Sequence, residues 1–136
     1  MKRILEVSPG FYIMAAAAVL ILPLRILAAA VFAAWLHEGA HLTVLHFFKI
    51  PVDSIQLGAG GARIMTGPMQ PVQELLCAAA GPLASLSLLM FLRCFPVLAL
   101  FGLIQGLFNL LPVFPLDGGR ILRAIWNVCI SSSGGR

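Results

Sequence analysis

The pentapeptide His37-Glu38-Gly39-Ala40-His41 holds two of the three histidines of the chain and one of its three glutamates. If this stretch is helical, residues four apart lie on one face, about 40° apart around the axis. Both imidazoles can then reach one Zn²⁺ ion, and Glu38 can take a proton from a water molecule as a general base. The pattern therefore predicts a hydrolytic zinc site. The alternative is that these side chains only form hydrogen bonds within a helix bundle.

A catalytic zinc ion takes three protein ligands and leaves its fourth position to water. His46 lies nine residues from His37, roughly 180° around the same helix, so we expect it to face away from the pair. Asp53 and Glu74 flank a long connection, where we expect them at the membrane surface. Asp117 ends the last apolar run. If the helices are antiparallel, their order brings Asp117 back to the side that His37 and His41 face. Asp117 is thus the expected third ligand, with a carboxylate at a helix end as the alternative.

The apolar run before Asp117 contains Pro112 and Pro115, which interrupt a helix. Broken helices occur in membranes where the break lines a wet or protein-enclosed cavity. We therefore expect this segment to line the path of water to the site. Gly118 and Gly119 allow the backbone to approach closely.

The composition indicates that lipid surrounds much of this chain. It is 60% hydrophobic and 10% charged, with a mean hydropathy of +1.00, whereas soluble domains carry about 25% charged residues. Residues 7–24, 75–92 and 94–116 carry no charge, and residues 26–48 carry only Glu38. Each run is long enough for a spanning helix, which needs about 20 residues. The basic residues are scattered, so no nucleic-acid partner is expected, and the three cysteines suggest small buried apolar side chains.

The predicted fold is an all-α integral membrane protein with about four transmembrane helices and a small membrane-associated β-hairpin between the second and third. We expect a single domain over residues 1–136, with helices at about 8–23, 25–48, 72–93 and 97–111 and a short C-terminal helix at about 118–130. The alternation of polar and apolar residues at 54–57 and the glycines that follow predict the hairpin at about 54–65. The first helix is expected to be retained rather than cleaved as a signal peptide.

Charge asymmetry predicts that the N-terminus and the active site face the cytoplasm. Two basic residues, Arg25 and Arg93, would then lie outside, and six would lie inside, which follows the positive-inside rule. The six are Lys2, Arg3, Lys49, Arg63, Arg120 and Arg123.

A transmembrane H-E-x-x-H followed by N-x-x-P-x-x-P-L-D-G-G at 109–119 resembles the site-2 protease family of intramembrane zinc metalloproteases. The likeness covers residues 8–123 and is closest to the short sporulation-type members, which process a membrane-associated pro-sigma factor. The segments Ser8-Pro9-Gly10-Phe11 and Ala80-Gly81-Pro82-Leu83 also match. The family often has Asn where this chain has Ser85, and its members usually continue for one or two further spans, often with a PDZ or CBS domain.

The resemblance implies that His37, His41 and Asp117 hold one Zn²⁺ ion, that Glu38 is the catalytic acid and base, and that Asn109 helps to hold substrate. It implies a membrane-embedded or membrane-associated protein substrate, cut in a bacterial cytoplasmic membrane, and the hairpin could offer an edge to an extended substrate strand. The end at Arg136 suggests a minimal core, a truncated product, or a core that a partner chain completes or regulates. The alternatives are an inactive scaffold protein derived from such a protease and, more remotely, a metal transporter.

Overall fold

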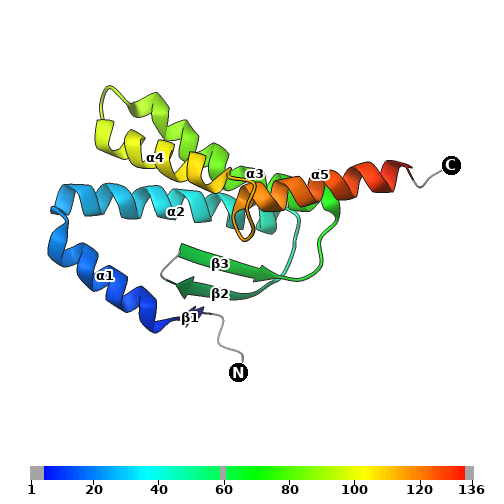
Figure 1. The fold of residues 1–136 in the computed structure, drawn as a ribbon, viewed down its shortest axis with the longest axis horizontal. Coiled ribbons are helices and arrows are strands. Elements are labelled where there is room, and N and C mark those ends of the chain that lie inside the picture. The colour runs from blue at the N-terminus through cyan, green and yellow to red at the C-terminus, as the bar shows by residue number, and fades with distance from the viewer. Residues whose placement is uncertain (1–4, 59–60, 134–136) are drawn as a thin grey trace.

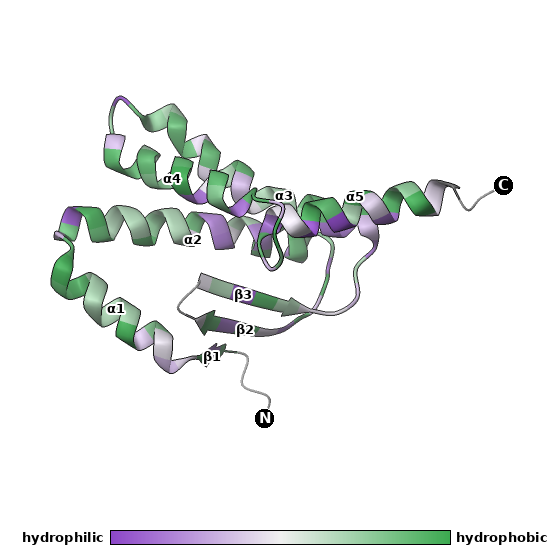
Figure 2. Ribbon diagram, in the orientation of Figure 1, coloured by the Kyte–Doolittle hydropathy of each residue, from purple (hydrophilic) through white to green (hydrophobic). Residues whose placement is uncertain are grey.

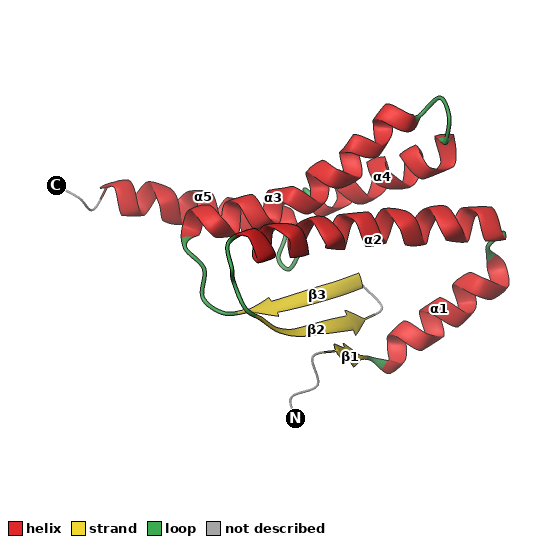
Figure 3. Ribbon diagram, turned by 180° about the vertical axis from the view of Figure 1, so that it is seen from behind, coloured by secondary structure: helices red, strands yellow, loops and turns green. Residues whose placement is uncertain are grey.

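The computed structural model describes residues 5–58 and 61–133. Lys2, Arg3 and two residues of the expected hairpin turn, 59 and 60, lie outside the described part. Helices dominate, and a small sheet lies beside the C-terminal half of the second helix (Figures 1 and 3). The elements in chain order are β1 (Leu5–Val7), α1 (Pro9–Ile21), α2 (Leu24–Phe47), β2 (Val52–Gly58), β3 (Gly61–Thr66), α3 (Pro71–Ser87), a 3-10 turn (Leu88–Phe91), α4 (Pro96–Asn109) and α5 (Asp117–Ser133).

Prolines mark the starts of the long helices. Pro9, Pro71 and Pro96 occupy the first turns of α1, α3 and α4, and Pro23 precedes α2. A proline is favourable there because the first N–H groups of a helix have no partner inside the helix. Each of these four prolines therefore marks the start of a helix, whereas Pro82 lies inside α3.

Two of the helical segments are long and apolar enough to cross a membrane by themselves. They are α2, with 24 residues, and α3 with its 3-10 extension, with 21 residues. The other two apolar helices, α1 and α4, have 13 and 14 residues, below the range of about 17–25 that a span needs. By length, the structure supports two of the four expected spans. Hydrophobic residues predominate along the helices (Figure 2), and many large ones are exposed, including Leu20, Trp35 and Met90.

The small sheet has three strands instead of the expected two. Its order is β1-β2-β3, with β1 parallel to β2 and β3 antiparallel to β2. The hairpin prediction missed β1, because Leu5–Val7 is too short for its alternation to be recognised in sequence. A two-stranded hairpin is only marginally stable by itself, and the third strand supplies further main-chain hydrogen bonds. Strand β3 forms one edge of this sheet.

Helix α3 lies at the centre of the bundle and packs against α2, α4 and α5. Gly102 and Gly106 of α4 permit the close approach of α4 to α3. A Cβ atom at Gly102 would lie 2.4 Å from the main-chain oxygen of Ser85, and one at Gly106 would lie 2.9 Å from Leu86. Polar side chains gather inside the bundle, where α2, α3 and α5 meet, and they form the site described next.

Candidate metal centre

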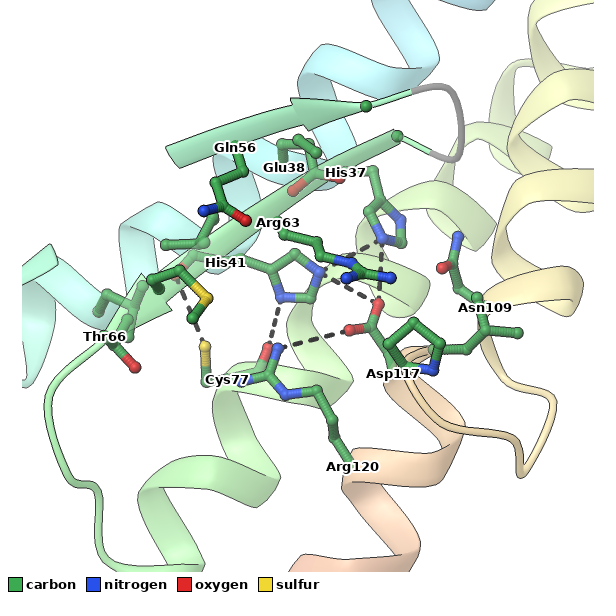
Figure 4. A pocket seen from close by; sticks show the side chains of 18 of the residues that line it. His37, Glu38, His41, Gln56, Arg63, Thr66, Cys77, Asn109, Asp117 and Arg120 are labelled. Carbon is green, nitrogen blue, oxygen red and sulfur yellow. Dashed lines mark hydrogen bonds and ion pairs between the residues drawn. The ribbon is translucent and has the colours of Figure 1, made fainter. Parts of the chain in front are cut away.

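Three side chains from two distant segments converge at the middle of the bundle. His37 Nε2 and His41 Nε2 lie 3.1 and 3.2 Å from Asp117 Oδ2, and the two nitrogens lie 3.3 Å from each other. All three residues are buried, with exposed fractions of 2%, 5% and 7%. Figure 4 shows both imidazoles of α2 directed at the carboxylate that begins α5. The structure thus brings together the three ligands that the sequence predicted.

The triangle of donor atoms has the dimensions of one face of a zinc coordination tetrahedron. Zinc binds nitrogen and oxygen at about 2.0–2.2 Å, so two ligand atoms of a tetrahedral site lie about 3.3–3.5 Å apart. The observed separations of 3.1 to 3.3 Å are close to that range. His37, His41 and Asp117 therefore fit a single Zn²⁺ ion and leave the fourth position open.

The hydrogen bonds behind the two imidazoles orient them for metal binding. His41 Nδ1 lies 2.7 Å from the main-chain oxygen of Cys77, which can only accept, so Nδ1 carries the proton and Nε2 presents a lone pair. His37 Nδ1 lies 2.8 Å from the hydroxyl oxygen of Ser85, which is completely buried. Such partners fix the ring and the tautomer of a metal-binding histidine. The lone pairs of neighbouring acceptors repel one another unless a cation lies between them.

Gly81 of α3 gives the imidazoles the space that they occupy. A Cβ atom at this position would lie 2.2 Å from His41 Nε2 and 2.8 Å from His37 Nε2. Both distances are far inside van der Waals contact, and both involve the atoms that would bind the metal. A glycine is therefore required at the point where α3 crosses the histidine pair.

The two glycines that follow Asp117 allow the preceding segment to pack closely against the start of α5. A Cβ atom at Gly118 would lie 2.2 Å from the main-chain oxygen of Leu110, and one at Gly119 would lie 2.8 Å from the backbone of Val113. The segment between α4 and α5 therefore folds tightly over the start of α5. Arg120 Nη1 also approaches Asp117 Oδ1, at 3.7 Å.

A second contact ties this connecting segment to α3. Arg123 of α5 forms an ion pair with the buried carboxylate of Glu74, which belongs to the first turn of α3. The guanidinium carbon of Arg123 also lies 4.9 Å from the centre of the Phe114 ring, in the broken segment. One arginine thus links α3, α5 and the segment that leads to Asp117.

Glu38 lines the same cavity as the three ligands and is half-buried. No hydrogen bond to its carboxylate is formed within the described residues, so the carboxylate is available to a water molecule or a substrate. The cavity has a volume of about 1210 Å³, and its lining includes residues of β2 and β3 and the segment from Phe114 to Asp117. Asn109 also lines it, and its amide nitrogen donates to the main-chain oxygen of Gln105 at 3.0 Å.

The remaining candidate ligands are not part of the group formed by His37, His41 and Asp117. His46 and Asp53 are exposed and do not line the cavity, whereas Glu74 lines the cavity but is paired with Arg123. The sequence reasoning noted Ser85 only as a departure from the family and did not give it a role. Its spacing of four residues from Gly81 was a usable signal, because that spacing puts both on one face of α3.

Comparison with known proteins agrees with this geometry. The sequence profile of peptidase family M50 matches residues 67–133. A zinc metalloprotease of Methanocaldococcus jannaschii is 36% identical over 104 residues, which cover 66% of this chain and 31% of that protein. Among solved structures, the site-2 protease from Methanocaldococcus jannaschii matches with a TM-score of 0.71 and 27% identity, over 93% of this chain and 68% of that chain. The chain spans about a third of the length of the curated relative.

Proposed function

We propose, because this chain belongs to peptidase family M50, that it is an intramembrane zinc metalloendopeptidase. The observation that carries the proposal is the triangle of His37 Nε2, His41 Nε2 and Asp117 Oδ2, buried in a bundle whose outer surface is apolar. The set comprises three ligands, an open fourth position and an adjacent carboxylate. It is the set that catalytic zinc sites use, whereas structural zinc sites fill all four positions with protein ligands.

In the proposed mechanism the chain supplies the ligands and the proton transfers. His37, His41 and Asp117 hold the ion, and the Ser85 hydroxyl and the Cys77 carbonyl keep both imidazoles in place. When bound, zinc polarises the scissile carbonyl and makes water acidic enough to be deprotonated near neutral pH. Glu38 accepts the proton of the attacking water on its carboxylate and passes it to the leaving amine.

The proposed substrate is a protein segment within or beside a membrane. A transmembrane helix hides its carbonyls in its own hydrogen bonds, so the segment must unwind before it is cut. Strand β3, at the edge of the sheet and along the cavity, could pair with the extended segment by β-augmentation, and Asn109 could hold it near the ion. The relation to sporulation-type members remains a prediction.

We further propose that α1 and α4 also lie in the bilayer, which gives a four-helix, multi-pass core that forms a single domain. The start of α2, which includes Arg25, and the turn before α4, which includes Arg93, lie at one end of the bundle (Figure 1). Lys49, Arg120 and Arg123 follow α2 or belong to α5. This separation agrees with a cytoplasmic active site in a bacterial membrane. A partner chain that completes or regulates the core is part of the same proposal.

Replacing the general base tests the proposed chemistry. In Glu38→Gln we expect bound zinc to stay near one ion per chain while cleavage of a co-expressed membrane substrate is abolished, because the amide cannot take up the proton. Glu6→Gln is the matched control, since Glu6 is an exposed glutamate that lines the same cavity. Undiminished cleavage by Glu38→Gln would refute the assignment of the base. A wild-type protein that binds zinc and cleaves nothing would identify a scaffold instead of an enzyme.

A further inference from the structure

A second hollow lies between α2 and α4, next to the metal cavity. Its volume is about 310 Å³, and Ala30 and Ala34 of α2 form part of one wall. Gln105, Phe108 and Asn109 of α4 line this hollow and the metal cavity as well. The hollow, which we call the α2–α4 groove, therefore adjoins the site where the chemistry is proposed.

The α2 wall of the groove leads along one face of the helix to the metal ligands. Ala30, Ala34, His37 and His41 are separated by four, three and four residues, so they lie within about 60° of one another around the axis. The two alanines come first, and their small side chains leave room for another helix to pack closely. A segment lying against them points toward His37.

The α4 wall contains a polar side chain that has no hydrogen-bond partner among the described residues. Between Val97 and Phe108 of α4, Gln105 is the only residue with a polar side chain. It is half-buried, and within the described residues its amide group forms no hydrogen bond. Placing an unpaired amide in apolar surroundings is costly, so this group should have a partner that arrives from elsewhere.

Gln105 and Asn109 lie one helical turn apart on the same side of α4. The amide nitrogen of Asn109 donates to the main-chain oxygen of Gln105, and this bond leaves the carbonyl oxygen of Asn109 free. A carboxamide carries both a donor and an acceptor, so it can pair with the N–H and the C=O of a peptide group. Two carboxamides one helical turn apart can therefore pair with successive peptide groups of a segment that is losing its helical hydrogen bonds.

We propose that the α2–α4 groove is the docking site for the transmembrane segment of the substrate and that Gln105 is a positioning residue for it. The segment packs its apolar side chains against Ala30 and Ala34, and Gln105 pairs with its first unwound peptide group before Asn109 holds the next. Main-chain groups freed in an apolar environment are costly without partners, so these amides lower the cost of unwinding. The inference rests on the proposed protease function.

Blocking the groove should separate membrane substrates from short peptides. The assay compares a single-span test protein with a short fluorogenic peptide that has the same sequence around the cut. In Ala34→Trp and in Gln105→Met we expect the ratio of kcat/KM for the membrane protein to that for the peptide to fall about tenfold or more, with bound zinc unchanged. Ala28→Trp is the matched control, because Ala28 is an exposed residue of α2 outside the groove. An unchanged ratio in Ala34→Trp would refute the docking site.

A crosslinking experiment tests the docking site without requiring cleavage of the substrate. In the Glu38→Gln background, Ala34→Cys should form a disulfide with a single cysteine in the membrane segment of the test protein, and Ala28→Cys should not. Equal crosslinking at both positions would overturn the groove as the docking site. A wild-type protein that cleaves neither substrate contradicts the protease function, and selective crosslinking at Ala34→Cys would still support docking.

Discussion

Gly81→Ala adds one methyl group at the point where α3 meets the metal ligands. That Cβ atom would lie 2.2 Å from His41 Nε2, 2.5 Å from His41 Cε1 and 2.8 Å from His37 Nε2. Ordinary contacts begin near 3.4 Å, so the imidazole of His41 would have to retreat by roughly 1 Å. Metal–ligand distances tolerate only about 0.2 Å. We therefore expect the variant to lose His41 as a ligand.

The loss of one ligand sets the expected size of the effect. Protein sites bind zinc with about 10–16 kcal/mol in total from four ligands, or about 3 kcal/mol for each. Since 1.4 kcal/mol corresponds to tenfold in affinity, Gly81→Ala should weaken zinc binding by at least about 100-fold. Cleavage should fall with zinc occupancy.

Competition with a chelator, followed by metal analysis of the purified protein, measures this affinity. The matched control is Gly39→Ala, which adds the same methyl group to the helix that carries the ligands, in a place where nothing lies within 4 Å of it. Near-wild-type zinc affinity in the control, with a large loss in Gly81→Ala, is the expected result. If Gly81→Ala bound zinc as tightly as the control, the packing of α3 against the histidines would differ from that described.

Three further variants test the supports of the site. Ser85→Ala removes the hydroxyl that contacts His37 Nδ1, and we expect about a 10- to 100-fold loss of zinc affinity, measured by chelator competition; unchanged affinity would mean that the hydroxyl does not orient the ring. Asp117→Ala should lose more affinity than Ser85→Ala because it removes a ligand, and a smaller loss would exclude it as the third ligand. Arg123→Gln leaves a buried carboxylate without its charged partner, so the free energy of unfolding should fall by about 1–3 kcal/mol, measured by thermal unfolding in detergent; an unchanged melting temperature would contradict this role.

Residues close in sequence made the helical part of the site predictable. His37, Glu38 and His41 belong to one pentapeptide, so helical periodicity alone places the two histidines on one face. Asp117 is different, because its place depends on how the helices pack. The two prolines, the glycine pair and the family resemblance pointed to it, and no local periodicity could.

The supporting contacts could not be derived because they join segments far apart in the chain. Ser85 contacts His37 across 48 positions, and the carbonyl of Cys77 contacts His41 across 36. A main-chain carbonyl has no sequence signature, and a serine in an apolar helix resembles many others. Strand β1 was missed for a related reason, since its pairing with β2 is decided by tertiary contacts.

The ligands of the candidate metal centre are contributed by α2 and by the first residue of α5, with 76 positions between His41 and Asp117. An ion held by both segments closes that stretch of chain into a loop, much as a disulfide would. In the chain-entropy description, closing a loop of this size lowers the entropy of the unfolded chain by an amount worth about 4.5 kcal/mol. An ion that binds only the folded chain stabilises that chain, and the stabilising free energy rises with the logarithm of the free ion concentration. The metal that the reaction requires would thus also act as a reversible cross-link, so that metal supply would govern the lifetime of the protein together with its activity.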